Sequence, residues 1–274
     1  MTRITKEKTL RLFNAIEEAN RAGRLGLILY TIPNFPNPDG FRAILEELSR
    51  RPAVSIIEMT FAVDGAFSDH ANETIRDAHR KAVTYESDYR KVLAAYEYGK
   101  PSLCVLYQKT VTDHSFPRVV QEMSQRVDGV LLEWSEDEHQ SYFEHSHRAG
   151  VELVQCVGPW MPAAEVERIL SFCMPRALVY LMSAPMTGGQ LFSRAELERL
   201  IALCRYLRPD IKLAAGFGIR TAEDVQKLSQ VRGLDGVIIG TAFLERMRDG
   251  TTAVARYLDE IEGALAHDSA RIAL

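Results

Sequence analysis

Residues 212–241, KLAAGFGIRTAEDVQKLSQVRGLDGVIIGT, place a short apolar run on each side of a segment with helical periodicity. The runs are KLAAGF (212–217) and GVIIGT (236–241), and glycines stand at or just beyond the end of both. An apolar residue at almost every position is typical of a strand buried on both faces of a parallel sheet. The stretch therefore predicts a strand–helix–strand unit whose two strand ends have an open backbone.

Six further apolar runs precede this unit, at 26–32, 54–59, 102–108, 129–134, 151–157 and 177–182. Helix-like segments alternate with them. Eight strands alternating with helices in 274 residues predict a (β/α)8 TIM barrel, formed as a single domain over residues 1–274 with an N-terminal helix before the first strand. A doubly wound open sheet is the alternative, but it usually has fewer strands and carries its glycine-rich loop after the first one.

Composition limits the kinds of partner. The net charge of −4 provides no broad basic field, which argues against nucleic acid or an anionic membrane as a partner. No apolar run approaches the ~20 residues that span a bilayer, and the first residues do not have the pattern of a signal peptide. The four cysteines form no CxxC pair, so we expect a cytoplasmic setting. His145 and His147 have no partner at ligand spacing, so we expect no metal site.

Glycine turns follow three neighbouring strands near the end of the chain. Gly218 follows the seventh strand, Gly240 and Thr241 follow the eighth, and APMTGGQ (184–190) follows the sixth. Glycines let main-chain N–H groups approach an anion, and the helix start after Gly240 adds its dipole. The three turns predict a site for the phosphate of a small-molecule substrate. At any one of them the alternative is a plain tight turn.

Two carboxylates are the candidates for acid–base chemistry. Glu58 lies at the end of an apolar strand, and Asp69 follows eleven residues later, on a loop that precedes an unusually long polar helix. Burial raises the pKa of a carboxyl group toward the range useful for proton transfer, and a second carboxylate can supply a fixed negative charge. The alternatives are an ion pair between Glu58 and a lysine or arginine, and a helix N-cap role for Asp69.

The Glu58 to Asp69 step, followed in order by YLMSAPMTG (180–188), GFGIRTAEDV (216–225) and GVIIGTAF (236–243), resembles the tryptophan synthase alpha subunit family. The resemblance covers residues 8–250. It implies an eight-stranded barrel that cleaves indole-3-glycerol phosphate to indole and glyceraldehyde 3-phosphate by a retro-aldol reaction without a cofactor. Glu58 would be the general acid–base, and Asp69 would hold the ring N–H. The other positions that match are Tyr107, Tyr180 and Thr187 around the ring and closing loop, and Gly188, Gly218, Gly240 and Thr241 at the phosphate.

The chain departs from this family in three places. Residues 59–69, MTFAVDGAFSD, replace a G-[IV]-P-F-S-D-P run that helps the alpha subunit meet its beta partner, so the usual coupling to a beta-like subunit is in doubt. Ala184 stands where the family has an arginine. Glu133 and Gln155 fall where the family has small or apolar residues against the indole, and their polar groups favour a more polar substrate.

Three hypotheses follow for the function. The first is a carbon–carbon lyase acting on indole-3-glycerol phosphate or a more polar analogue. The second is a catalytically weak subunit that binds a phosphorylated ligand and regulates a partner enzyme, which the altered sixth loop would suit. The third is a phosphate-binding barrel isomerase. The carboxylate pair favours the lyase, because a protein that only binds has no need of an acid–base group.

Overall fold

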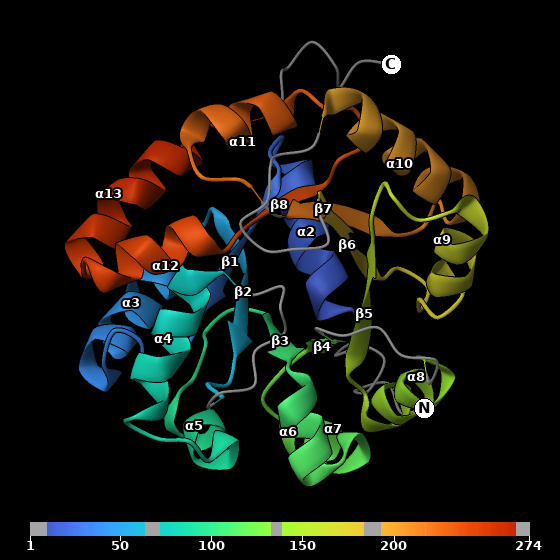
Figure 1. The fold of residues 1–274 in the computed structure, drawn as a ribbon. Helices are drawn as coiled ribbons and strands as arrows, with labels where there is room; N and C mark the ends of the chain where they lie inside the picture. Colours follow the sequence, from blue (N-terminus) through green and yellow to red (C-terminus); the bar gives the residue numbers. More distant parts are fainter. Residues whose placement is uncertain (1–9, 64–71, 133–138, 184–192, 217, 267–274) are drawn as a thin grey trace.

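The eight predicted strands form a closed parallel barrel in sequence order. The computed structural model describes residues 10–63, 72–132, 139–183, 193–216 and 218–266. Figure 1 shows the strands in the middle and the helices in a ring around them. The TIM barrel that the sequence predicts is confirmed. Its strands are β1 (Gly26–Thr31), β2 (Val54–Thr60), β3 (Ser102–Leu106), β4 (Gly129–Leu132), β5 (Glu152–Val157), β6 (Leu178–Met182), β7 (Lys212–Gly216) and β8 (Gly236–Ile239).

Helices connect each strand to the next around the outside of the barrel. Two of the described helices follow each of β2, β3 and β8, and the last pair ends the barrel. The described helices are α2 (Arg11–Arg21), α3 (Pro38–Arg50), α4 (Glu73–Val83), α5 (Tyr89–Ala95), α6 (Gln108–His114), α7 (Phe116–Met123), α8 (His139–Ala149), α9 (Ala163–Leu170), α10 (Arg194–Leu207), α11 (Ala222–Ser229), α12 (Thr241–Arg248) and α13 (Thr251–Glu262).

The prediction of one long polar helix after the second strand is wrong, because the segment forms two helices, α4 and α5. The break follows from local side-chain chemistry. The Glu86 carboxylate accepts hydrogen bonds from the N–H groups of Ser87 and Asp88, and Asp88 then caps α5 by accepting from the Arg90 N–H. Such side-chain bonds offer the backbone an alternative to continuing the helix.

The predicted N-terminal helix, α2, lies across the N-terminal end of the barrel. In Figure 1 it is seen inside the ring of helices, against the strands. Leu12 and Ile16 are fully buried on its inner side. The strand starts make room for it with glycines, because a Cβ on Gly26 would lie 2.4 Å from Ile16 Cδ1 and one on Gly129 would lie 2.5 Å from Leu12 Cδ1. The helix therefore closes this end, and ligands reach the barrel from the opposite end.

Carboxylates fasten neighbouring strands together at the closed end. Each accepts a hydrogen bond from a backbone N–H at the start of an adjacent strand, which satisfies a donor at the edge of the ladder. The bonds run from Ser102 N–H to Asp128 (2.9 Å), from Leu178 N–H to Glu152 (2.6 Å) and from Leu213 N–H to Asp235 (2.7 Å).

No helix in the described ranges is long and apolar enough to cross a bilayer. The same ranges contain no group of three or more His, Cys, Asp and Glu side chains placed to hold a metal ion. Cys104, Cys156, Cys173 and Cys204 are all free thiols.

Replacing Gly129 by Ala tests the fit between α2 and the strands. The new Cβ would lie 3.2 Å from the Glu152 carbonyl oxygen as well as against Leu12, so we expect a loss of about 1–3 kcal/mol of unfolding free energy. Urea unfolding measures it. The control is Gly263→Ala, whose Cβ would meet nothing within 4 Å. Equal stabilities of the two variants would contradict this packing.

Candidate active site

Glu58 lies in β2 with its side chain buried, at 2% exposure. Removal from water raises its pKa to about 8, and no other cause contributes to that shift. Among the described residues no lysine or arginine forms an ion pair with it, so the structural alternative of a paired barrel carboxylate finds no support there. Its main-chain oxygen accepts a hydrogen bond from the Thr31 hydroxyl at 3.0 Å, which holds the strand next to β1. The result is a carboxyl group that is protonated at neutral pH.

The side chains on the inner face of the barrel, which is the face that carries Glu58, can be followed from strand to strand. Tyr30 of β1 is the ladder partner of Glu58, and Thr60 lies two residues beyond Glu58 on the same face. The register then pairs Thr60 with Val105, Val105 with Leu131, Leu131 with Val154, and Cys156 with Tyr180.

The inner face opposite Glu58 is therefore largely apolar. Val105 and Leu131 are buried, while Cys156 and Tyr180 are partly exposed, as expected for a wall at the open end. Burial raises the pKa values of Cys156 and Tyr180, and the nearby Glu58 charge raises them further. This wall suits the flat face of a ring. Tyr30, Val105, Leu131 and Cys156 were missed in the sequence, although counting alternate residues along each strand would have found them.

Gln155 lies on the other face of β5. Its ladder partner is Val179 rather than Tyr180, and its amide donates to the Leu153 carbonyl oxygen at 3.4 Å. Because side chains alternate along a strand, Cys156 lies on the inner face, where the sequence predicts Gln155. The predicted ring contact of Gln155 is therefore not supported by its position.

Tyr107 directly follows β3 and stands at the N-cap position of α6. It is buried, and its ring meets the His79 ring edge-on at a centroid distance of 5.0 Å. His79 accepts a hydrogen bond from the Val63 N–H at 3.1 Å, and burial lowers its pKa to about 3. Tyr107 thus lies at the C-terminal end of β3 against a neutral histidine, and its contact with a ring stays a prediction.

The predicted phosphate turns of β7 and β8 lie side by side, because the two strands pair directly. Gly218 has a φ of +75°, a conformation that favours glycine. Gly240 occupies the N-cap position of α12, and Thr241 is the first residue of that helix. The first N–H groups of a helix have no acceptor within it and favour an anion.

Asn72 links the first turn of α12 to the start of α4. Its side-chain amide donates to the Thr241 hydroxyl at 2.8 Å, while its carbonyl oxygen accepts from the Ile75 N–H at 3.1 Å and caps α4. The N-cap position of α4 is thus occupied by Asn72, and the alternative of a capping role for Asp69 concerns a position outside the described residues. The predicted roles of Asp69, Glu133, Thr187 and Gly188 concern positions outside the described residues.

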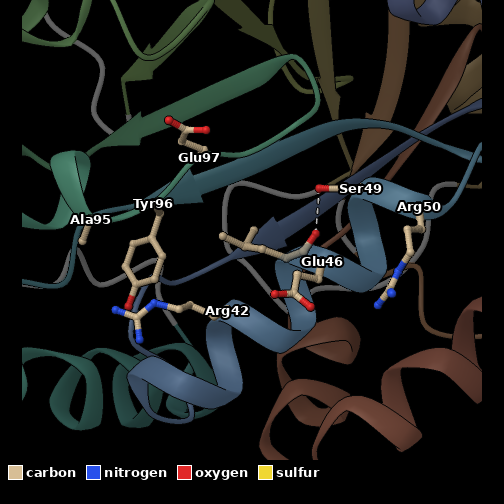
Figure 2. Close-up of a pocket in the computed structure, with 8 residues that line it drawn as sticks. Arg42, Glu46, Ser49, Arg50, Ala95, Tyr96 and Glu97 are labelled. Atoms are coloured by element: carbon tan, nitrogen blue, oxygen red, sulfur yellow. Dashed lines mark hydrogen bonds between the residues drawn. The ribbon is translucent and has the colours of Figure 1, made fainter.

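A separate cavity of about 520 Å³ lies between α3 and residues 95–97, away from the inner face. Figure 2 shows Arg42 beside the ring of Tyr96, and a dashed line marks the hydrogen bond from Ser49 to the Leu45 carbonyl oxygen (2.8 Å). Its arginines are already paired, Arg42 with Asp39 and Arg50 with Glu47. No predicted site residue lines it. The lining residues are Arg42, Leu45, Glu46, Ser49, Arg50, Ala95, Tyr96 and Glu97.

Comparison with known proteins points to one family. A family model described as tryptophan synthase alpha chain matches residues 16–269. The tryptophan synthase alpha chain of Solibacter usitatus is 29% identical over 254 residues, which cover 89% of this chain and 91% of the relative. That of Chlorobaculum parvum is 24% identical, over 87% of this chain and 93% of its own. A solved structure of Mycobacterium tuberculosis tryptophan synthase has a TM-score of 0.81 at 20% identity, covering 93% of this chain and 98% of the other.

Replacing Glu58 by Gln tests the cost of burying this carboxyl. The pKa rises from 4.5 to about 8 on folding, so stability linked to Glu58 is fully present below pH 4.5 and is lost as pH rises to about 8. We expect similar stabilities of wild type and Glu58→Gln at pH 4.5, and a variant more stable by about 2–4 kcal/mol at pH 8. Denaturant unfolding at several pH values measures this. A difference that does not change with pH would contradict it.

Proposed function

This chain belongs to the tryptophan synthase alpha chain family, and from that premise we propose that its buried Glu58 carries out the acid–base chemistry. The family cleaves indole-3-glycerol phosphate to indole and glyceraldehyde 3-phosphate, and the chain is accordingly an aldehyde-lyase. The observation that carries the assignment of Glu58 is a protonated carboxyl group on the inner face, opposite an apolar wall and without an ion-pair partner among the described residues.

The raised pKa sets the order of the proton transfers. Glu58 starts protonated at neutral pH and gives its proton to the ring carbon that bears the side chain. The resulting carboxylate then takes the proton of the adjacent hydroxyl while the carbon–carbon bond breaks and the aldehyde forms. The ring recovers its aromatic electrons as indole, and Glu58 ends protonated. No proton is gained or lost over the cycle.

The rest of the substrate is divided between two parts of the site. The first N–H groups of α12, with Gly218 and Thr241, hold the phosphate. The apolar wall that contains Leu131 and Cys156 receives the ring. Asp69 completes the site by holding the ring N–H and stabilising the positive charge that develops when the ring carbon is protonated.

The proposal also covers the need for a beta subunit and the cellular compartment of the protein. The family typically works with a beta subunit, but residues 59–69 lack the family's run at that meeting point, so we expect this chain to release indole alone. A beta-like subunit added to the assay would then change the rate little. Four free thiols fit a reducing, cytoplasmic setting.

Incubating the purified chain with indole-3-glycerol phosphate tests the assignment. Wild type releases indole and glyceraldehyde 3-phosphate, whereas Glu58→Gln is slower by roughly 10³-fold. The matched control is Glu152→Gln, because Glu152 is equally buried and burial also raises its pKa to about 8, yet it lies at the closed end of the barrel. This control keeps the wild-type rate. Unchanged turnover in Glu58→Gln would refute the mechanism, and tight binding without product in wild type would favour the regulatory subunit.

The pH dependence of kcat/KM gives a second check. Because the reaction starts from protonated Glu58, the value for the free enzyme stays level up to pH about 8 and then falls roughly tenfold per pH unit. Stopped assays across pH 6 to 10, with enzyme stability checked at each pH, measure the profile. A value that rises through pH 8 would mean that the carboxylate form starts the reaction.

A further inference from the structure

The hydroxyl group of Tyr30 is a buried donor that the site described so far leaves unused. Tyr30 lies in β1 and is 7% exposed. Its Oη makes no hydrogen bond of normal geometry to a described residue, although the Tyr107 side chain lies near enough to raise its pKa. Leaving a buried hydroxyl unpaired costs about 1–3 kcal/mol, so a protein that keeps one at a binding site gains by pairing it with a ligand.

Tyr30 stands between the two ends of the proposed substrate site. On one side it is the ladder partner of Glu58 and shares its face of the barrel. On the other side it adjoins the phosphate turn, because a Cβ on Gly240 would lie 3.8 Å from the Tyr30 Cβ. Burial raises the pKa of Tyr30, and smaller contributions come from the charge of Tyr107, from a weak side-chain hydrogen bond with Tyr107 and from the charge of Glu58, so the Tyr30 hydroxyl is a donor at neutral pH.

The other tyrosine of the inner face is placed differently. The Tyr180 ring lies against Gly216, where a Cβ would come within 2.3 Å of the ring carbon Cε1 and 2.6 Å of the hydroxyl oxygen. Its hydroxyl is thus directed over the end of β7. Tyr30 is the one of the two that adjoins both Glu58 and the turn before α12.

Indole-3-glycerol phosphate carries two hydroxyl groups between its ring and its phosphate. The one beside the ring gives its proton to Glu58 in the proposed mechanism. The other, next to the carbon that bears the phosphate, does not react and needs a partner once it leaves water. It must lie between the carboxyl group and the phosphate turn, which is where Tyr30 stands.

We propose that Tyr30 binds the unreactive hydroxyl of the substrate's three-carbon chain and so selects a hydroxylated chain. This inference rests on the proposed function, because it takes the substrate from it. The bond is made equally in the bound substrate and in the transition state, so its loss raises KM and leaves kcat nearly unchanged.

Calorimetric binding in the Glu58→Gln background tests this without turnover. Two ligands are compared: indole-3-glycerol phosphate and indole-3-propyl phosphate, which lacks both hydroxyls. Adding Tyr30→Phe weakens binding of the first by roughly tenfold and leaves binding of the second unchanged. The matched control is Tyr98→Phe, because Tyr98 is also buried, its hydroxyl has no hydrogen-bond partner among the described residues, and its raised pKa includes no contribution from Glu58. It leaves the binding of both ligands unchanged.

Each other outcome overturns either the Tyr30 inference alone or the inference together with the proposed substrate. Equal weakening of both ligands by Tyr30→Phe would mean that Tyr30 acts by packing, and no weakening of either would mean that its hydroxyl binds nothing on the chain. Both results overturn the Tyr30 inference and leave the lyase intact. Failure of the Glu58→Gln background to bind indole-3-glycerol phosphate, while it binds the propyl analogue, would overturn the proposed substrate and the inference together.

Discussion

The burial of one carboxyl group, Glu58, in an otherwise apolar barrel interior is the constraint on which the site depends. A carboxylate is costly to take out of water, so the group stays protonated there and can donate a proton at neutral pH. This requires walls that keep water and cations away, which Val105, Leu131 and the neighbouring strands supply. It also requires a rigid frame, which α2 and the carboxylates at the closed end provide. The chemistry is thus a property of the barrel more than of the side chain alone.

The barrel contains two buried carboxyl groups in different settings, one structural and one proposed to react. Glu152 and Glu58 are both buried, and burial raises both pKa values to about 8. Glu152 has one oxygen fixed by the Leu178 N–H, at the end that α2 covers. Glu58 makes no side-chain bond to a described residue and faces the open end. Solvent removal therefore raises the pKa, but position relative to the open end decides whether a ligand can use the proton.

Most of the fold was readable in the sequence because both faces of each strand are buried, which leaves uninterrupted apolar runs. Details that depend on single side-chain bonds were not. The helix break at Glu86 and the cap at Asn72 depend on hydrogen bonds from side chains to the main chain, and these bonds are visible only in the structure. Gln155 shows the effect of a one-residue error in register, which turns a side chain to the other face of a strand. Tyr30 was passed over because a tyrosine in a strand is ordinary, and only three-dimensional neighbours make its hydroxyl notable.

Hydrogen bonds hold the chain on both sides of residues 64–71, and the bond between Asn72 and Thr241 is one of them. On one side of residues 64–71 the Val63 N–H is tied to His79, and on the other Asn72 is tied to the first turn of α12. A stretch of chain fixed at both ends can be exchanged without moving the strands, because the anchors carry the register. The barrel strands pair in unbroken order on both sides of this stretch. Substitutions in residues 64–71 are therefore expected to alter the choice of substrate or partner with little effect on folding.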